Sequence, residues 1–332
     1  MSISPDAFLN DLLGFLKTSA LKAAIELDLF SAIAAEAGDL NRIARRTGAS
    51  ERGVRILCDF LTVHGFLDKP EERWRLTPST EVFLTRASPA YMGSVADFLA
   101  SPEMLGLWLT DPAGFVRKGG SLGLISEAPD SPIWIKFARA MAPFVAPAAE
   151  RIAAEVAALP RPPGRVLDIA AGHGLFGIRL AQALPAGEVT ALDWPAVLAV
   201  ALENAAAAGV SARYRTLPGS AFELAWGEGY DLVLLTNFLH HFSKEDCVGL
   251  LARTRRALRP GGRALALDFV PNEDRVSPPF PAMFAYMMLG QTPQGDAYTA
   301  REFEEMGAGA GFAGVTMQAA EPTPQTMIWF ET

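Results

Sequence analysis

Side chains that can bind ligands or move protons stand near the ends of short apolar runs in the second half of the chain. These side chains are Asp168, Asp193, His240, His241 and Asp268. A histidine can take up a proton near neutral pH, and a neighbouring carboxylate can orient it and stabilise its charged form. If the apolar runs are parallel strands, their carboxyl ends border one crevice, where catalytic groups concentrate. The pattern therefore predicts acid–base chemistry beside a bound ligand.

A loop of small residues follows the first of these runs. Residues 164–177 read Gly-Arg-Val-Leu-Asp-Ile-Ala-Ala-Gly-His-Gly-Leu-Phe-Gly. This order predicts a buried strand, a tight loop and the start of a helix, an arrangement that lets the backbone approach a ligand closely. Gly172, Gly174 and Gly177 also match the pattern G-x-G-x-x-G, and Asp193 follows about 20 residues further on, as in dinucleotide-binding proteins.

Asp168 favours a different ligand from a dinucleotide. A carboxylate where the first strand ends would face a pyrophosphate at short range, and like charges in a cleft repel each other strongly. The same carboxylate suits a ligand that carries an ammonium and a sulfonium group. Asp193 suits either ligand, because it can accept hydrogen bonds from ribose hydroxyls. A nicotinamide-dependent oxidoreductase therefore stays an alternative at this point.

Strands and helices alternate from residue 165 onward. The expected strands are 165–169, 188–192, 212–216, 230–236 and 263–270, and the expected helices between them are 175–184, 195–208 and 244–258. This rhythm predicts an α/β fold with a doubly wound parallel sheet. The tail is expected to add an antiparallel hairpin at 314–320 and 325–331. Pro160–Gly164 is the expected boundary between this region and the helices before it.

The first part of the chain has the pattern of a winged helix. We expect helical structure over 5–35, a capped helix over 39–48, a further helix over 51–64 and a small hairpin over 65–78. A DNA-binding regulator is one interpretation. Eight basic residues against seven acidic ones over 36–75 leave a net charge of only +1, which is little for phosphate neutralisation. We therefore interpret this part as a dimerisation or packing module, followed by helical structure over 90–159.

Composition limits the class of protein. The chain has 332 residues, half of them hydrophobic, which favours two domains with a large core. Its net charge of −8 argues against nucleic-acid binding. Cys58 and Cys247 are expected to be reduced thiols, and no Cys/His spacing predicts a metal site. We find no pattern of a signal peptide and no apolar run long enough for a membrane span, so a soluble, cytoplasmic protein is expected.

Several stretches, taken together, resemble the motifs of class I S-adenosylmethionine-dependent methyltransferases. Val166–Gly174 resembles the first motif, and Asp193-Trp-Pro resembles the acidic end of the second strand. Residues 230–247 and 258–263 resemble the later motifs. Their order is similar to that in the small-molecule O-methyltransferase family, which includes plant caffeic acid, hydroxyindole and bacterial antibiotic-tailoring enzymes. The resemblance implies a Rossmann-like sheet, a homodimer and a role in secondary metabolism.

The resemblance also implies three parts of the chain and a cofactor site. The parts are a winged-helix dimerisation domain at 1–95, a helical linker at 96–160 that contributes to the substrate pocket, and an S-adenosylmethionine-binding domain at 161–332. The predicted cofactor contacts are Asp168, Gly172, Gly174, Asp193, Trp194, Ser220, Ala221, Phe222 and Asn237. Ser220 stands where the family usually has Asp. Trp194 can cover one face of the adenine or simply pack beside Pro195.

His240 occupies the family's position for the general base. The resemblance implies that Asp268 orients it, and His241, where Asp is usual, is expected to orient or pack. The family's second acidic position holds Ala297, and the side chain of Asp296 should point elsewhere. This departure leaves open O-methylation of a more acidic hydroxyl, C-methylation, and a non-methylating decarboxylase or cyclase.

An apolar acceptor pocket completes the prediction. The residues expected to enclose a flat aromatic ligand are Phe137, Met141, Phe144, Met283, Met287 and Met288. Methionines adapt to irregular shapes, although such residues can equally form core or a dimer interface. The sequence thus predicts an S-adenosylmethionine-dependent methyltransferase that acts on a hydroxyl of a small, aromatic metabolite, without a nucleic-acid or membrane partner.

Overall fold

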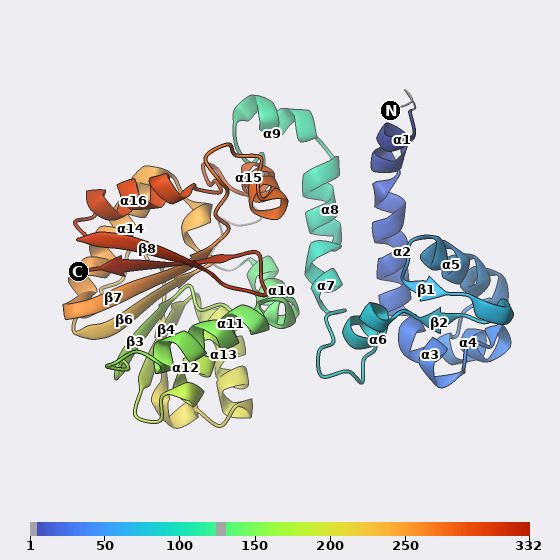
Figure 1. The fold of residues 1–332 in the computed structure, drawn as a ribbon, viewed down its shortest axis with the longest axis horizontal. Helices are drawn as coiled ribbons and strands as arrows, with labels where there is room; N and C mark the ends of the chain where they lie inside the picture. Colours follow the sequence, from blue (N-terminus) through green and yellow to red (C-terminus); the bar gives the residue numbers. More distant parts are fainter. Residues whose placement is uncertain (1–4, 124–130) are drawn as a thin grey trace. The chain divides into compact units, whose positions relative to one another are not determined.

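The computed structural model in Figure 1 describes residues 5–123 and 131–332. Residues 124–130, which fall in the expected helical stretch 90–159, lie outside this description. The chain forms two compact units, Met1–Leu105 and Gly106–Thr332. Each unit has a hydrophobic core of its own.

The first unit consists of short helices and one small hairpin. Its elements in chain order are α1 (Asp6–Leu12), α2 (Gly14–Glu26), α3 (Leu29–Ala35), α4 (Leu40–Thr47), α5 (Glu51–Val63), β1 (Leu67–Asp68), η1 (Pro70–Glu72), β2 (Arg75–Leu76), α6 (Pro78–Leu84) and α7 (Val95–Leu99). The stretch 5–35 is helical as expected, but it is divided at Leu13 and at Asp28. Asp28 has a φ of 50°, and this left-handed backbone cannot continue a right-handed helix.

Side-chain caps set the ends of α4 and α5. Asp39 accepts a hydrogen bond from Arg42 N, and Gly48 ends α4 in the left-handed conformation. Ser50 accepts a hydrogen bond from Gly53 N at the start of α5. Leu67 then pairs with Leu76 in the antiparallel hairpin. These features confirm the predicted order of helix, helix and hairpin.

Apolar side chains lie exposed on α1 and the start of α2. The most exposed are Phe8, at 63%, and Leu12, at 58%, and Phe15 is 54% exposed. Several large apolar groups on consecutive turns form a patch of the kind that marks a protein interaction surface. Among the described residues, no helix has the length and apolar character needed to cross a bilayer.

The second unit is built on a mixed sheet with strand order β5-β4-β3-β6-β7-β9-β8. Its strands are β3 (Arg165–Ile169), β4 (Glu188–Asp193), β5 (Tyr214–Pro218), β6 (Tyr230–Thr236), β7 (Leu258–Asp268), β8 (Gly314–Ala319) and β9 (Thr326–Glu331). The strands β3 to β7 run parallel, while β9 pairs antiparallel with β7 and with β8. The predicted doubly wound sheet with a C-terminal hairpin is confirmed.

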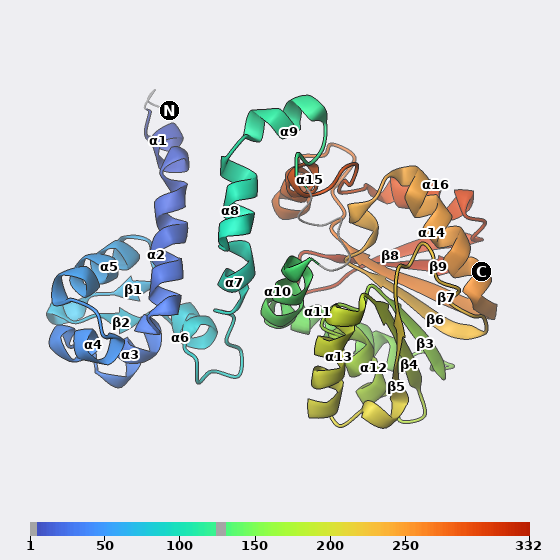
Figure 2. The same ribbon diagram turned by 180° about the vertical axis from the view of Figure 1, so that it is seen from behind.

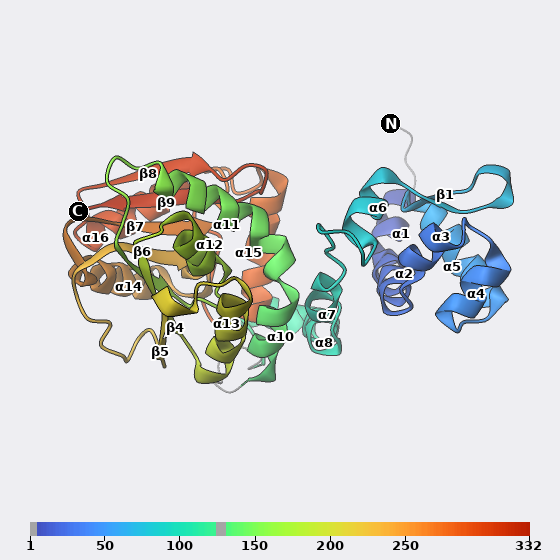
Figure 3. The ribbon, with the colours of Figure 1, turned by 90° about the horizontal axis from the view of Figure 1, so that it is seen from below.

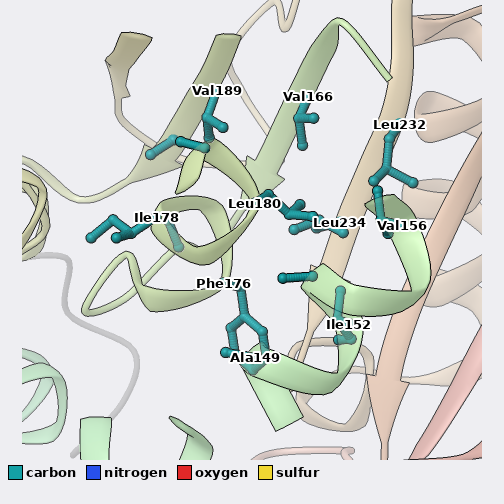
Figure 4. Close-up of a cluster of buried hydrophobic side chains, with 14 of the residues drawn as sticks. Ala149, Ile152, Val156, Val166, Phe176, Ile178, Leu180, Val189, Leu232 and Leu234 are labelled. Atoms are coloured by element: carbon teal, nitrogen blue, oxygen red, sulfur yellow. The ribbon is translucent and has the colours of Figure 1, made fainter. Parts of the chain in front are cut away.

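Helices cover both faces of this sheet, as Figures 2 and 3 show. The helices on one face are α11 (Ala142–Ala157), α12 (Leu175–Ala183) and α13 (Pro195–Ala207), and those on the other are α14 (Lys244–Ala257) and α16 (Ala300–Gly309). In Figure 4, Phe176 and Leu180 of α12 lie in one cluster with Ile152 of α11 and Leu234 of β6. The largely exposed segment Pro160–Gly164 joins α11 to β3 inside the second unit, and the two compact units divide earlier, after Leu105. The helices before the sheet are α8 (Pro102–Leu109), α9 (Pro112–Lys118) and α10 (Pro132–Ala140).

The sequence did not reveal two helices of this unit. One is α16, whose Thr299 and Glu302 form a capping box at its start. The other is α15 (Pro279–Gln291), which carries apolar residues around its whole circumference. A helix without an apolar stripe lacks the periodicity by which helices are detected. α15 matters for the site, because it supplies Phe284, Met287 and Met288.

Candidate active site

The site lies at the carboxyl ends of the parallel strands. The small-residue loop follows β3, Asp193 ends β4, Asn237 and His240 follow β6, and Asp268 ends β7. Because β4, β3, β6 and β7 are neighbours in the sheet, these groups share one edge. This edge is the usual ligand crevice of an open α/β sheet.

The loop after β3 has an unusual backbone. Ala170, Gly172 and Gly174 all have positive φ, at 54°, 58° and 75°. A Cβ atom on Gly174 would lie 2.5 Å from the Tyr214 hydroxyl and 2.9 Å from Ala201 Cβ, so no side chain fits there. A Cβ on Gly172 would have no atom closer than 4.0 Å. The loop is therefore packed against the protein at Gly174 and open at Gly172.

Asp193 ties this loop to the second strand. Its Oδ2 accepts a hydrogen bond from Gly172 N at 2.8 Å, and its Oδ1 accepts one from Trp194 N at 2.7 Å. Burial raises the pKa of Asp193 to about 6, although the two amide hydrogen bonds oppose the shift. Each carboxylate oxygen keeps a further lone pair that can accept a ligand hydroxyl.

Asp168 lies beneath the loop, fully buried. Its Oδ2 accepts a hydrogen bond from Gly177 N at 3.0 Å, in the first turn of α12. Its Oδ1 is enclosed and has no hydrogen-bond partner among the described residues. Burial raises the pKa of Asp168 to about 7, and the nearby Asp193 adds to the shift. The structure thus places this carboxylate against the helix start, where its charge can act on a ligand through space.

The other predicted cofactor contacts are spread over three loops. Trp194 is the N-cap residue that precedes α13, and it packs against Ala138 and Val197. Ser220 Oγ accepts a hydrogen bond from Phe222 N, and Ala221 is buried. Phe222 is partly exposed, with its ring 4.9 Å from that of Phe242.

Asn237 lies where β6 ends and has a left-handed φ of 53°. Its backbone N–H donates to Leu267 O at 2.8 Å, and its Oδ1 accepts a hydrogen bond from Gln325 Nε2. Gln325 is almost completely buried and immediately precedes β9. The C-terminal hairpin thus supports the loop that leads to His240.

His240 and Asp268 form a buried pair. Nδ1 of His240 lies 2.7 Å from Oδ1 of Asp268, and the two residues are 3% and 1% exposed. The same carboxylate oxygen accepts a hydrogen bond from Phe269 N at 2.9 Å. Because a carboxylate only accepts hydrogen bonds, Nδ1 of His240 donates, and the lone pair of the neutral ring is on Nε2. The pair can therefore take up a proton through Nε2.

His241 faces a different neighbour from His240. Its ring centroid is 4.4 Å from that of His240 and 6.1 Å from that of Trp134, which it meets edge to face. Burial and the adjacent His240 hold the pKa of His241 well below its usual range. His241 is therefore a neutral packing partner near neutral pH, and Asp268 is the group that orients His240.

Apolar residues enclose one side of His240. Phe284 meets its ring edge to face at 4.8 Å, and Phe284 packs with Phe269, Met288 and Ala297. Ala297 is fully buried in this cluster, where it offers only a methyl group and no carboxylate. The neighbouring Asp296 turns its carboxylate towards Arg275, at 3.4 Å, while its backbone N–H donates to His240 O.

Only some of the predicted pocket residues lie beside His240. Phe144, Met287 and Met288 belong to the apolar cluster beside His240. Met141 is buried, and Phe137 meets Trp134 edge to face. Met283, by contrast, is 61% exposed in this unit. The contacts therefore place Phe144, Met287 and Met288 with the His240 neighbours and leave Met283 on the surface.

Comparison with known proteins identifies the family. The O-methyltransferase domain matches residues 127–313, and the O-methyltransferase dimerisation domain matches residues 9–86. The chain belongs to the O-methyltransferase family. It is 30% identical to 3-hydroxy-5-methyl-1-naphthoate 3-O-methyltransferase of Streptomyces sahachiroi, over 93% of this chain and 90% of that protein. It is also 30% identical to acetylserotonin O-methyltransferase of Mus musculus molossinus, over 90% and 81% of the two chains.

Solved structures resemble this O-methyltransferase over its whole length. A candidate O-methyltransferase of Nostoc punctiforme PCC 73102 is 42% identical, with a TM-score of 0.94 and complete coverage of both chains. Human N-acetylserotonin methyltransferase, solved in complex with SAM, has a TM-score of 0.85 at 22% identity, with 100% and 98% coverage. The second likeness concerns the fold alone.

This O-methyltransferase uses S-adenosylmethionine, the methyl donor of its family, and the site fits it. Asp168 Oδ1 is a buried oxygen without a hydrogen-bond partner among the described residues, and within 5–123 and 131–332 no lysine or arginine forms an ion pair with Asp168 or Asp193. Two carboxylates without a protein cation suit a ligand that brings its own positive charge and disfavour a pyrophosphate. In the sequence, Asp168 argues against a nicotinamide dinucleotide, and S-adenosylmethionine as the cofactor agrees with that interpretation.

Sequence reasoning did not single out three residues that contact the predicted site. Gln325 is 88 positions from Asn237 in the chain, so only the pairing of β7 with β9 brings them together. Trp134 of α10 contacts His241, although the two residues are far apart in the sequence. His173 was visible as the one large residue within a loop of small ones, and that contrast could have singled it out.

Proposed function

We propose that this O-methyltransferase methylates a hydroxyl of a small aromatic metabolite, with His240 as the general base. The observation that carries the proposal is the 2.7 Å contact between His240 Nδ1 and Asp268 Oδ1 at the edge of the sheet where the cofactor loop lies. The cofactor, when bound, supplies an electrophilic methyl group on a sulfonium. The protein's task is to align the acceptor, exclude water and remove the hydroxyl proton.

The buried pair is suited to proton removal. Asp268 holds the Nδ1–H of His240, so Nε2 carries the lone pair that accepts a proton from the acceptor hydroxyl. The proton leaves His240 charged, and the adjacent carboxylate stabilises that imidazolium. His241, which is neutral near pH 7, adds no competing positive charge beside it.

The surroundings of His240 favour an aromatic acceptor. Phe269 and Phe284 lie with ring centroids 4.1 Å apart, and Met288 and Ala297 complete this apolar wall. Aromatic faces and methionine side chains accommodate flat rings. The two relatives named above are, by their names, methyltransferases for a hydroxynaphthoate and for acetylserotonin. Support for an aromatic substrate therefore comes both from the residues and from the relatives.

We also propose that the enzyme is a homodimer formed through its first unit. That unit matches the O-methyltransferase dimerisation domain. It exposes Phe8, Leu12 and Phe15, a surface that a second copy would cover. The prediction of a dimerisation module in place of a DNA-binding one agrees with both observations. Size-exclusion chromatography with light scattering should give twice the chain mass, and Phe8→Glu together with Leu12→Glu should give the monomer.

The catalytic proposal is tested by product analysis. The enzyme would be incubated with S-adenosylmethionine and a panel of hydroxylated naphthoates, benzoates and indoles, and mass spectrometry would search for the gain of one methyl group. NMR of the product would locate the methyl on oxygen. A methyl on carbon would replace the proposed chemistry, and an active enzyme in which His240→Ala turns over normally would remove His240 from its role as base.

A further inference from the structure

His173 lies within the cofactor loop and has a defined tautomer. Its Nδ1 accepts a hydrogen bond from Leu175 N at 3.0 Å, and the residue is only 3% exposed. A nitrogen that accepts an N–H hydrogen bond carries no proton, so the ring proton of neutral His173 is on Nε2. The contact also gives α12 a side-chain cap, because Gly174 at the N-cap position has no side chain to offer.

The ring of His173 stays neutral at physiological pH. Burial lowers the pKa of His173 to about 4. A charged imidazolium would also lose the Nδ1 lone pair that Leu175 N uses, and it would stand at the positive end of the α12 dipole. His173 therefore presents one permanent hydrogen-bond donor, the Nε2–H group.

Neighbouring elements hold His173 in place from other sides. Asn204 Nδ2 on α13 donates to His173 O at 2.9 Å, and the Phe176 ring lies 6.1 Å from the imidazole. Among the residues that the structure describes, no hydrogen bond to Nε2 is found. The backbone oxygen and Nδ1 are thus used to fix the residue, and the Nε2–H is left for a ligand.

The charge of the surrounding groups indicates which ligand atom needs this donor. Asn204 uses its Nδ2 to hold His173 O, and the other polar side chains near the loop are those of Asp168, Asp193 and Tyr214. The two carboxylates are acceptors, and the Tyr214 hydroxyl is enclosed against Gly174, so these three offer no exposed donor to an anion. S-adenosylmethionine ends in an amino acid whose carboxylate must be hydrogen-bonded when it leaves water.

We propose that His173 is a cofactor-binding residue, whose Nε2–H donates a hydrogen bond to the carboxylate at the amino-acid end of S-adenosylmethionine. In this arrangement Asp168 faces the positive groups of the cofactor and Asp193 its ribose hydroxyls, while the neutral imidazole and the loop amides serve the negative group. The assignment does not depend on His240, which acts on the acceptor.

Two probe ligands isolate this contact. S-adenosylhomocysteine contains the amino-acid end, whereas 5′-methylthioadenosine shares the adenosine and the thioether but lacks the carboxylate. Isothermal titration calorimetry would compare their binding to the wild type, His173→Asn and His173→Gln. Asparagine can place an acceptor near the Nδ1 position and keep the Leu175 cap, whereas glutamine can place a donor near the Nε2 position. Melting temperatures without ligand would report whether each variant is folded.

We expect the loss of affinity to be largest for S-adenosylhomocysteine and for the His173→Asn variant. His173→Asn should weaken S-adenosylhomocysteine about 10- to 100-fold, the usual effect of a lost hydrogen bond to a charged group, and change 5′-methylthioadenosine less than about threefold. His173→Gln should retain more of the S-adenosylhomocysteine affinity than His173→Asn. An equal loss for both ligands in His173→Asn, or no loss at all, would overturn the assignment.

A spectroscopic measurement tests the tautomer directly. The chain has four histidines, so each imidazole can be assigned by single substitution in a long-range ¹H–¹⁵N NMR spectrum. We expect His173 to be protonated on Nε2 alone at pH 7, with a shift of that nitrogen on adding S-adenosylhomocysteine and almost none on adding 5′-methylthioadenosine. A proton on Nδ1 would contradict the inference. If His240→Ala bound S-adenosylhomocysteine normally but lost turnover, the base assignment would stand independently of this result.

Discussion

The cofactor side and the acceptor side of the site are built in different ways. At the ends of β3 and β4, the groups available to bind the cofactor are mainly backbone amides and two buried carboxylates, and Asp193 contacts Gly172 directly. At the ends of β6 and β7, a single His–Asp pair stands against aromatic rings and methionines from α15. One side recognises a ligand of fixed charge and shape, and the other offers one reactive group beside an adaptable apolar wall.

This difference suggests how the fold can keep one cofactor and change acceptors. The cofactor loop leaves no room for variation at Gly174, where any side chain would collide with Tyr214 and Ala201. The wall beside His240 consists of side chains whose exchange would reshape a pocket without disturbing the sheet. Substitutions on the two sides should therefore separate into effects on cofactor binding and effects on turnover.

The largest expected effect is on the acceptor side. His240→Ala should lower kcat/KM about 10²- to 10⁴-fold, because it removes the group that takes the hydroxyl proton. Asp268→Asn should give a smaller loss, since His240 would remain but lose the carboxylate that orients it. Both variants should bind S-adenosylhomocysteine as the wild type does. Initial rates with an acceptor found in the panel above measure the first effect, and calorimetry the second.

His64→Ala is the control for the histidine substitutions. His64 is exposed after α5 in the first unit, so its loss should leave kcat/KM unchanged. If His240→Ala instead lost cofactor affinity and kept its turnover at saturating cofactor, the division between the two sides would be incorrect.

The next largest effect belongs to the cofactor side. Asp193→Ala removes the acceptor for Gly172 N and Trp194 N as well as the predicted contact to the ribose. S-adenosylhomocysteine should bind about 10- to 100-fold more weakly, as expected for loss of a charged hydrogen-bond acceptor. Glu188→Gln, at the exposed start of the same strand, is the control and should bind normally. Equal affinities in calorimetry for Asp193→Ala and wild type would contradict this assignment.

The sequence predicted the groups at the strand ends better than the groups that reach the site through tertiary packing, and the reason is physical. The loop, Asp193 and the His240–Asp268 pair all sit at the ends of short strands, so local patterns and the parallel order place them together. Gln325 and Trp134 reach the site only through tertiary packing, by the pairing of β7 with β9 and by the contact of α10 with α13. α15 escaped detection because its apolar residues show no stripe. Local sequence carries no trace of such contacts.

The free energy of unfolding of the unliganded protein should depend on pH through the carboxylates of the cofactor side. The pKa of Asp168 is raised from 3.8 to about 7, so the folded protein holds a proton that the unfolded chain has already lost between these values. Stability must then fall as pH rises through this window, and the contribution is gone above pH 7. Between pH 5.5 and 7.5 we expect a loss of about 1–2 kcal/mol from this group. Asp168→Asn should remove that part of the slope, measured by urea unfolding.

Asp193 provides the internal comparison for this measurement. Its pKa of about 6 adds a second contribution of the same sign, so Asp168→Asn should flatten the profile without abolishing it. If the free energy of unfolding of the wild type rose with pH, or if Asp168→Asn left its pH dependence unchanged, the buried carboxylate would already be charged in the unliganded protein.

The smallest expected effect concerns Asn237, which lies between the two sides. Gln325→Leu removes the hydrogen bond to Asn237 Oδ1 and leaves this side chain free to rotate within a loop whose left-handed φ depends on its surroundings. Because Asn237 is a predicted cofactor contact, S-adenosylhomocysteine should bind about three- to tenfold more weakly, the usual range for one neutral hydrogen bond. Gln318→Leu on the exposed strand β8 is the matched control. Should calorimetry show unchanged binding while kcat falls, Gln325 would support His240 instead, and Asn237 would belong to the acceptor side.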